Sequence, residues 1–120
     1  MIIIEISDRA NIYKTVSFAL EIINLCKALQ NQREYVISRQ ILRSATSIGA
    51  NMYEASSAHT KRDFIYKTSI ALKEARETKY WLFLLSESKL AQYDYDDLLA
   101  RLEEIEKILS RIIITAKHNL

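Results

Sequence analysis

Hydrophobic residues recur along this chain at steps of three and four, the spacing that places side chains on one face of an α-helix. Four segments share this pattern, and we predict helices over residues 8–30, 32–56, 61–87 and 95–117. The third and fourth segments are the most regular. Their core-facing positions are Phe64, Thr68, Ala71, Ala75, Thr78, Leu82 and Leu85, followed by Leu98, Leu102, Ile105, Leu109, Ile112 and Ala116.

The first two helices are predicted to complete the core. In the first helix, the expected inward face is Ile12, Val16, Ala19, Ile23 and Cys26. In the second helix, it is Ile37, Ile41, Ser44, Ile48, Met52 (or Asn51) and Ala55. Polar side chains interrupt the inward face of the second helix, which sets it apart from the other three.

Three of the predicted helix starts carry a capping signal, a polar N-cap residue with a partner three positions later. These pairs are Asn31 with Glu34, Thr60 with Asp63, and Asp94 with Asp97. The predicted connections are short, and short connections make consecutive helices antiparallel neighbours. We therefore predict an all-α fold, an antiparallel up-down-up-down four-helix bundle that forms a single domain over residues 1–120.

The composition supports this fold class. The chain has no proline and one glycine, whereas β-sheet proteins need such residues at their turns. Hydrophobic residues make up 49% and charged residues 27%, which argues against a disordered chain. No apolar run approaches the roughly 18 residues of a membrane span. Glu5 interrupts the apolar run at the N-terminus, so we predict no signal peptide and expect a cytoplasmic protein.

Candidate catalytic and metal-binding residues are few. His59 and His118 fall in a predicted connection and near the C-terminus, and neither follows a glutamate at the spacing of a di-iron site. Cys26 is the only cysteine and lies on a predicted inward face, so we expect an unreactive core thiol and no structural zinc site. No glycine-rich phosphate loop is present. We predict a protein without enzymatic activity, cofactor or metal.

A set of polar residues on the second and third helices is predicted to meet across the bundle. In an antiparallel pair joined by this connection, residues whose numbers sum to about 117 face each other. Arg43 then lies opposite Glu74 or Glu77. We expect a structural polar network that fixes helix register, with a binding site as the alternative interpretation. The residues of this network are Arg43, Ser44, Ser47, Asn51, Glu54, Glu74 and Glu77.

The same region carries a family resemblance. Residues 43–55 read RSATSIGANMYEA, and Lys61, Arg62, Asp63, Phe64, Ala71, Glu74, Glu77 and Tyr80 follow. Over about residues 10–115 the chain resembles the four-helix-bundle proteins of the ribosomal RNA intervening-sequence family. It is also similar to the accessory protein of diversity-generating retroelements. The resemblance implies an up-down bundle, a homo-oligomeric ring with five subunits (a pentamer), nucleic-acid binding by a basic surface, and docking to a reverse transcriptase.

The charge distribution points toward an anionic partner. The net charge is only +2, but residues 33–79 carry nine Lys/Arg against five Asp/Glu. A basic segment of this kind favours RNA or DNA as partner, and two solvated helix faces are the alternative interpretation. The front of the fourth helix is acidic, unlike the strongly basic retroelement accessory proteins. The candidate nucleic-acid-binding residues are Arg33, Arg39, Lys61, Arg62, Lys67, Lys73 and Lys79.

Two functions stay open at this point. The first is an oligomeric nucleic-acid-binding or ribonucleoprotein accessory module, with Tyr53, Tyr66 and Trp81 as candidate base-stacking residues. The second is a structural or protein-interaction bundle without a nucleic-acid role, in which side chains outside the predicted core form subunit or partner contacts. Those side chains are Phe18, Tyr35, Leu42, Trp81, Phe83 and Ile113. The resemblance favours the first function.

Overall fold

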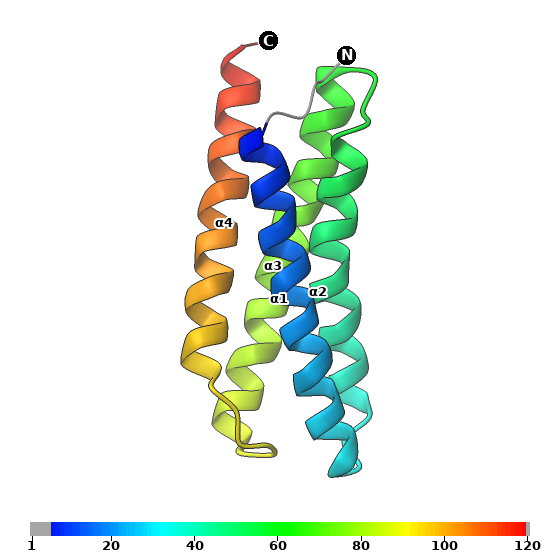
Figure 1. Cartoon of the computed structure of the whole chain (residues 1–120), viewed down its shortest axis with the longest axis vertical. Coiled ribbons are helices and arrows are strands. Elements are labelled where there is room, and N and C mark those ends of the chain that lie inside the picture. Colours follow the sequence, from blue (N-terminus) through cyan, green and yellow to red (C-terminus); the bar gives the residue numbers. More distant parts are fainter. Residues whose placement is uncertain (1–5, 120) are drawn as a thin grey trace.

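Four long helices account for nearly the whole chain. A computed structural model describes residues 6–119, and Figure 1 shows its course. The helices are α1 (Ile6–Asn31), α2 (Val36–Ala55), α3 (Lys61–Ser88) and α4 (Tyr95–His118). They lie along one axis in a body of 47 × 21 × 20 Å. None of the four carries a stretch long and apolar enough to cross a lipid bilayer.

Consecutive helices run antiparallel and occupy the four corners of a square. α2 contacts α1 and α3, while α4 contacts α3 and α1. In the described part of the chain, α1 and α3 make no contact and therefore stand diagonally opposite each other. The α2–α3 connection lies at the end of the bundle where α1 begins and α4 ends (Figure 1). The predicted all-α antiparallel four-helix bundle is confirmed.

The core follows the predicted faces of α2, α3 and α4. Every expected inward residue of α3 except Phe64 is buried, and so are the first four of α4. On α2, Ile41, Ser44, Ile48, Met52 and Ala55 are buried. The expected N-caps of α3 and α4 are also present, because Thr60 Oγ1 accepts a hydrogen bond from Asp63 N and Asp94 Oδ1 accepts one from Asp97 N, both at 3.0 Å.

The predicted inward face of α1 is wrong except at Cys26, which is buried. Val16 is 45% exposed, whereas Phe18, which we expected outside the core, is buried. The buried face of α1 consists of Thr15, Phe18, Ile22, Leu25, Cys26 and Leu29. The spacing of apolar residues alone did not decide whether the predicted or the observed face of α1 is buried, because α1 has apolar side chains around most of its circumference. The larger side chains of the second face fill the core better, which is why it is the buried one.

The predicted start of α2 at residue 32 is also wrong, because the helix begins at Val36. Arg33 adopts a left-handed backbone with φ of 61°, a conformation that ends a helix. Asn31 does not cap α2. Instead, the Glu34 carboxylate accepts hydrogen bonds from Ile37 N at 2.6 Å and Ser38 N at 3.4 Å. This places a negative charge at the positive end of the helix dipole.

Gly49 marks a close approach of α1 and α2. A Cβ atom added at Gly49 would lie 2.7 Å from Oγ1 of Thr15 and 3.3 Å from its Cβ. The Thr15 hydroxyl donates a hydrogen bond to the Ile12 carbonyl at 2.6 Å, so it is held in this position. The only glycine of the chain therefore serves the contact between two helices rather than a turn.

We predict that Gly49→Ala destabilises the protein. In an ordinary helix interior this substitution stabilises by up to about 1 kcal/mol, but here the methyl group collides with Thr15 and should cost about 1–3 kcal/mol. In a Thr15→Ala background the same change should cost at least about 1 kcal/mol less, because the hydroxyl is gone. Urea unfolding measures both, and equal costs in the two backgrounds would contradict the contact.

Candidate nucleic-acid interface

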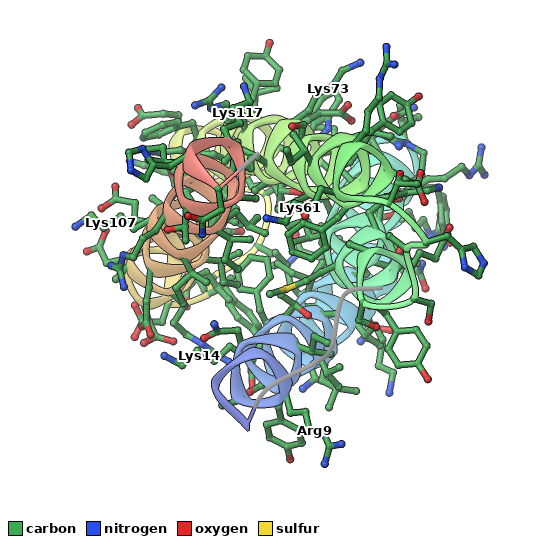
Figure 2. All side chains as sticks on the ribbon, turned by 90° about the horizontal axis from the view of Figure 1, so that it is seen from above. Arg9, Lys14, Lys61, Lys73, Lys107 and Lys117 are labelled. Carbon is green, nitrogen blue, oxygen red and sulfur yellow. The ribbon has the colours of Figure 1, made fainter. Side chains whose placement is uncertain are left out.

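Positive charge is concentrated at the end of the bundle that holds the α2–α3 connection. We call this half, residues 9–18, 47–73 and 105–119, the basic end. It carries nine Lys/Arg against three Asp/Glu, a net of +6, whereas residues 19–46 and 74–104 carry eight against ten, a net of −2. Figure 2 looks down on this end, where Arg9 and Lys107 point away from the bundle and Lys61 lies between the ends of α3 and α4.

The predicted nucleic-acid-binding residues do not form one surface. Four of them, Lys61, Arg62, Lys67 and Lys73, lie on the first half of α3 at the basic end. Arg33 lies in the connection before α2, and Arg39 lies in the first turn of that helix; both are exposed at the opposite end. Lys79 lies in the second half of α3, facing α4.

Several of these cations already have partners. Lys67 pairs with Glu54 at 3.0 Å, and its hydrogen bond to that carboxylate raises the pKa of Lys67. Lys79 lies 3.5 Å from both Glu103 and Glu106 of α4.

Lys61 Nζ donates a hydrogen bond to the Asn119 carbonyl at 2.6 Å, which joins the start of α3 to the end of α4. Arg62 and Lys73 are exposed, and within the described residues no carboxylate lies within ion-pair distance of either. Of the predicted set at the basic end, these two are therefore the cations available to a ligand.

The basic end also holds cations that the sequence interpretation missed. The antiparallel fold brings the second half of α4 beside the first half of α3, as the Lys61–Asn119 bond shows. α4 is acidic in its first half and basic in its second, a split that was visible in the sequence. The added residues are Arg9 and Lys14 on α1 and Lys107, Arg111 and Lys117 on α4.

A hollow between α1 and α4 opens at the basic end. It has a volume of about 370 Å³ and is lined by Asn11, Lys14, Glu104, Lys107, Ile108, Arg111 and Ile112. Next to it lies a smaller one of about 200 Å³. Lys14 and Glu104 line both hollows and form an ion pair. The hydrogen bond from Lys14 lowers the pKa of the Glu104 carboxyl. Arg101 donates to Ser17 Oγ at 2.9 Å. The lining combines three cations with one carboxylate, so the hollow favours an anionic group.

The polar residues between α2 and α3 form direct bonds across that pair. Arg43 donates to Glu74 at 3.0 Å and also to Glu77. Thr78 Oγ1 and Ser44 Oγ are hydrogen-bonded at 2.8 Å. Each contact joins one helix to the other, so together they fix the register of α2 against α3.

The other members of the expected network act differently. Ser47 donates to the Arg43 carbonyl and Asn51 to the Ser47 carbonyl, both at 2.8 Å and both within α2. Glu54 reaches α3 through Lys67 alone. The bridging network therefore lies in the half of the bundle away from the α2–α3 connection.

Reactive groups are sparse in the described residues. Burial raises the pKa of Cys26 to about 11, and its thiol donates to the Ser38 carbonyl at 3.4 Å, so it is protonated at neutral pH. His59 and His118 are exposed at the surface. Across residues 6–119, no three His, Cys, Asp or Glu side chains are grouped where they would hold a metal ion.

Comparison with known families identifies the group to which this chain is related. The family model described as 23S rRNA-intervening sequence protein matches residues 10–111. The chain belongs to this family. The match spans the hydrophobic core of all four helices, and it includes the RSATSIGANMYEA segment on α2 with its partners on α3.

A solved structure resembles this intervening-sequence family member closely. It is a protein of unknown function from the S23 ribosomal protein family of Bacteroides thetaiotaomicron VPI-5482, with 48% sequence identity and a TM-score of 0.83. The alignment covers 86% of this chain and 97% of the other. No curated protein matches the chain.

We predict that Arg43→Ala destabilises this family member. The substitution leaves Glu74, whose side chain is only 12% exposed, without its cation, and it should lower the free energy of unfolding by about 1–2 kcal/mol. Lys67→Ala breaks an exposed pair and serves as the control, with a loss below about 1 kcal/mol. Urea unfolding at neutral pH measures both. An Arg43→Ala variant as stable as the wild type would contradict the role of the network.

The loss of stability caused by Arg43→Ala should also depend on pH. The Trp81 indole N–H, and next to it Arg43, hold the pKa of Glu77 below its ordinary 4.5. A carboxylate whose pKa is lower in the folded than in the unfolded protein stabilises the fold above the unfolded value, and this contribution disappears as the pH falls through the folded value. The stability difference between wild type and Arg43→Ala should therefore be full at pH 6–7 and shrink below about pH 4.5.

Proposed function

We propose that this protein is a non-enzymatic, self-associating module that binds RNA or DNA through the basic end of its bundle. The observation that carries the proposal is the concentration of nine Lys/Arg against three Asp/Glu in that half of the molecule. The family description refers to intervening sequences of 23S rRNA, which makes RNA the first partner to test. Docking to a reverse transcriptase or another protein stays a prediction from the resemblance.

The geometry of the basic end supports phosphate contacts rather than a folded ligand pocket. Arg62, Lys107 and Arg111 are exposed, come from two adjacent helices, and have no carboxylate within ion-pair distance among residues 9–119. Lys and Arg side chains arranged in this way bind a polyanion by releasing its counterions. Several copies in one assembly would strengthen such binding, because each contact after the first is effectively intramolecular.

The outer face of α1 supports self-association. Tyr13, Val16 and Leu20 are 72%, 45% and 56% exposed, and their spacing of three and four places them in one stripe. We call these three residues the α1 stripe. An apolar stripe of this kind on a surface helix favours a protein contact. The same observation favours the alternative function, a protein-interaction bundle without a nucleic-acid role. A ring of five subunits is the assembly that the family resemblance implies.

Charge reversal tests the proposed interface. We expect the protein to bind labelled RNA and DNA oligonucleotides in fluorescence anisotropy with an affinity that falls log-linearly between about 50 and 300 mM salt. Arg62→Glu and Lys107→Glu should each weaken binding and flatten the salt slope by about one or more. Lys27→Glu is the control, because Lys27 is equally exposed but lies at the opposite end. No binding at the lowest salt, or an equal effect of all three variants, overturns the basic-end interface.

A pair of valines tests the α1 stripe. We predict that Val16→Asp lowers the mass of the assembly in sedimentation velocity, because a carboxylate in an apolar contact is strongly disfavoured. Val36→Asp is the matched control, since Val36 is exposed at the start of α2 and outside the stripe. If the wild type is a monomer, or if Val16→Asp leaves the mass unchanged, the stripe is not a subunit contact.

A further inference from the structure

The outer face of α3 combines exposed aromatic rings with exposed cations along one helix. Tyr66, Tyr80 and Phe83 are 62%, 57% and 51% exposed. The exposed cations Arg62, Lys73 and Arg76 lie on the same stretch of the helix, Arg62 before Tyr66 and the other two between Tyr66 and Tyr80. We call these six residues the α3 stripe. At 1.5 Å per residue it extends about 32 Å, which is long enough for several nucleotides of an extended strand.

The helical spacing brings these residues to one side. Steps of four, seven, three, four and three residues separate them, which keeps them within about a third of the helix circumference. Two of the three carboxylates in this part of α3, Glu74 and Glu77, are bound to Arg43 of α2, and the third, Asp63, is exposed in the first turn of the helix. In the described residues, none of the three cations of the stripe lies within ion-pair distance of a carboxylate. The stripe is therefore a basic surface with exposed rings between its charges.

The ring nearest the middle of α3 is held in place. Tyr80 packs edge-on against Trp81, with ring centroids 5.2 Å apart and an angle of 67°. The Trp81 indole N–H donates to Glu77 Oε2 at 3.1 Å, and Glu77 is bound to Arg43. Hydrogen bonds that join α3 to α2 thus support one side of the Tyr80 ring, so less conformational freedom is lost when a ligand stacks on it.

We propose that the α3 stripe is a stacking platform for single-stranded nucleic acid, with bases on Tyr66 and Tyr80 and phosphates on Arg62, Lys73 and Arg76. The inference rests on the proposed nucleic-acid function and specifies the form of the ligand. A basic track combined with aromatic side chains on which bases can stack is the arrangement that binds single strands without sequence preference. A duplex keeps its bases stacked inside, so it gains only the charge contacts and no benefit from the rings.

The position of the stripe is compatible with self-association. α3 stands diagonally opposite α1, and Figure 2 places Lys73 on the far side of the bundle from Arg9 of α1. A contact between copies that covers the α1 stripe without using α3 leaves the α3 stripe accessible. A contact between copies through the α3 stripe itself is the competing explanation of its exposed rings, and the experiment separates the two.

The test compares single-stranded and duplex ligands. The probes are fluorescent oligo(dT) and oligo(U) of about 20 nucleotides and a mixed-sequence duplex of the same length. We expect the wild type to bind the single strands more tightly than the duplex. Tyr66→Ala and Tyr80→Ala should each weaken single-strand binding by about fivefold to a hundredfold while changing duplex binding by less than twofold. Tyr66→Phe should retain the affinity, because stacking needs the ring and not the hydroxyl.

A matched control exists just before α2. Tyr35 is 53% exposed and lies outside both the α3 stripe and the basic end, so Tyr35→Ala should leave both affinities unchanged. Trp81 gives a second readout, because it is the only tryptophan of the chain. A base that stacks on Tyr80 lies beside it, and saturating oligo(dT) should quench its fluorescence in the wild type but not in Tyr80→Ala.

The outcomes distinguish this inference from the proposed function. If duplex and single strand bind equally and the tyrosine variants behave like the wild type, the stacking platform is overturned while charge-driven binding stands. If Tyr66→Ala or Tyr80→Ala lowers the mass of the assembly in sedimentation velocity, the stripe is a contact between copies and the inference fails. If no nucleic acid binds at about 50 mM salt, both the inference and the proposed function fail.

Discussion

The contact between α2 and α3 determines the geometry on which the rest of the bundle depends. Its buried positions include Ser44 and Ala45 on α2 and Ala71 and Ala75 on α3. Small side chains let two helix axes approach to the short end of the usual 8–10 Å range. At that separation, Thr78 reaches Ser44 directly, and no other register of the two helices preserves that bond. The Ser44–Thr78 hydrogen bond and the ion pairs of Arg43 thus together fix how the helices align.

The contact between α1 and α4, on the other side of the bundle, is looser. Two accessible features lie here, the hollow between these helices and the α1 stripe. The buried face of α1 packs large side chains into the core. Its contact with α2 is made by a smaller side chain, Thr15, which lies against Gly49 of α2. Between α1 and α4 the charged pair of Lys14 and Glu104 bridges a hollow instead of an apolar contact. In the part of the chain that the structure describes, the α1 stripe is exposed. Its exposed apolar area adds nothing to the stability of one copy, which is why a contact with another molecule is the better explanation.

The fold was largely predictable, and the errors have specific physical causes. The cores of α3 and α4 followed the sequence because one unbroken series of steps of three and four runs through each of these helices. α1 did not, because Val16 and Phe18 both belong to apolar faces, and the choice depends on side-chain volume in the assembled core. The start of α2 was missed because Arg33 takes a left-handed backbone without being glycine or asparagine. Local sequence patterns do not predict a left-handed backbone at an arginine.

The candidate interface was only partly predictable, since charge depends on neighbours distant in sequence. Lys79 looked as free as Lys73, but the fold brings Glu103 and Glu106 to it. Lys107 and Arg111 fell outside the basic segment, but the fold places the second half of α4 beside the first half of α3. A composition count over a stretch of sequence cannot account for either effect, because both arise from the antiparallel return of α4 along α3.

The two stripes and the basic end together form a consistent arrangement. In a closed ring with rotational symmetry, every copy points its basic end to the same side. The +6 of that half is then repeated around one rim, where like charges repel one another. In the proposed ring, a polyanion bound at this rim would relieve the repulsion, so assembly and ligand binding would favour each other. A net charge of +2 spread evenly over a monomer would be too small to attract a polyanion. In the proposed ring, the positive charge is instead gathered at one rim.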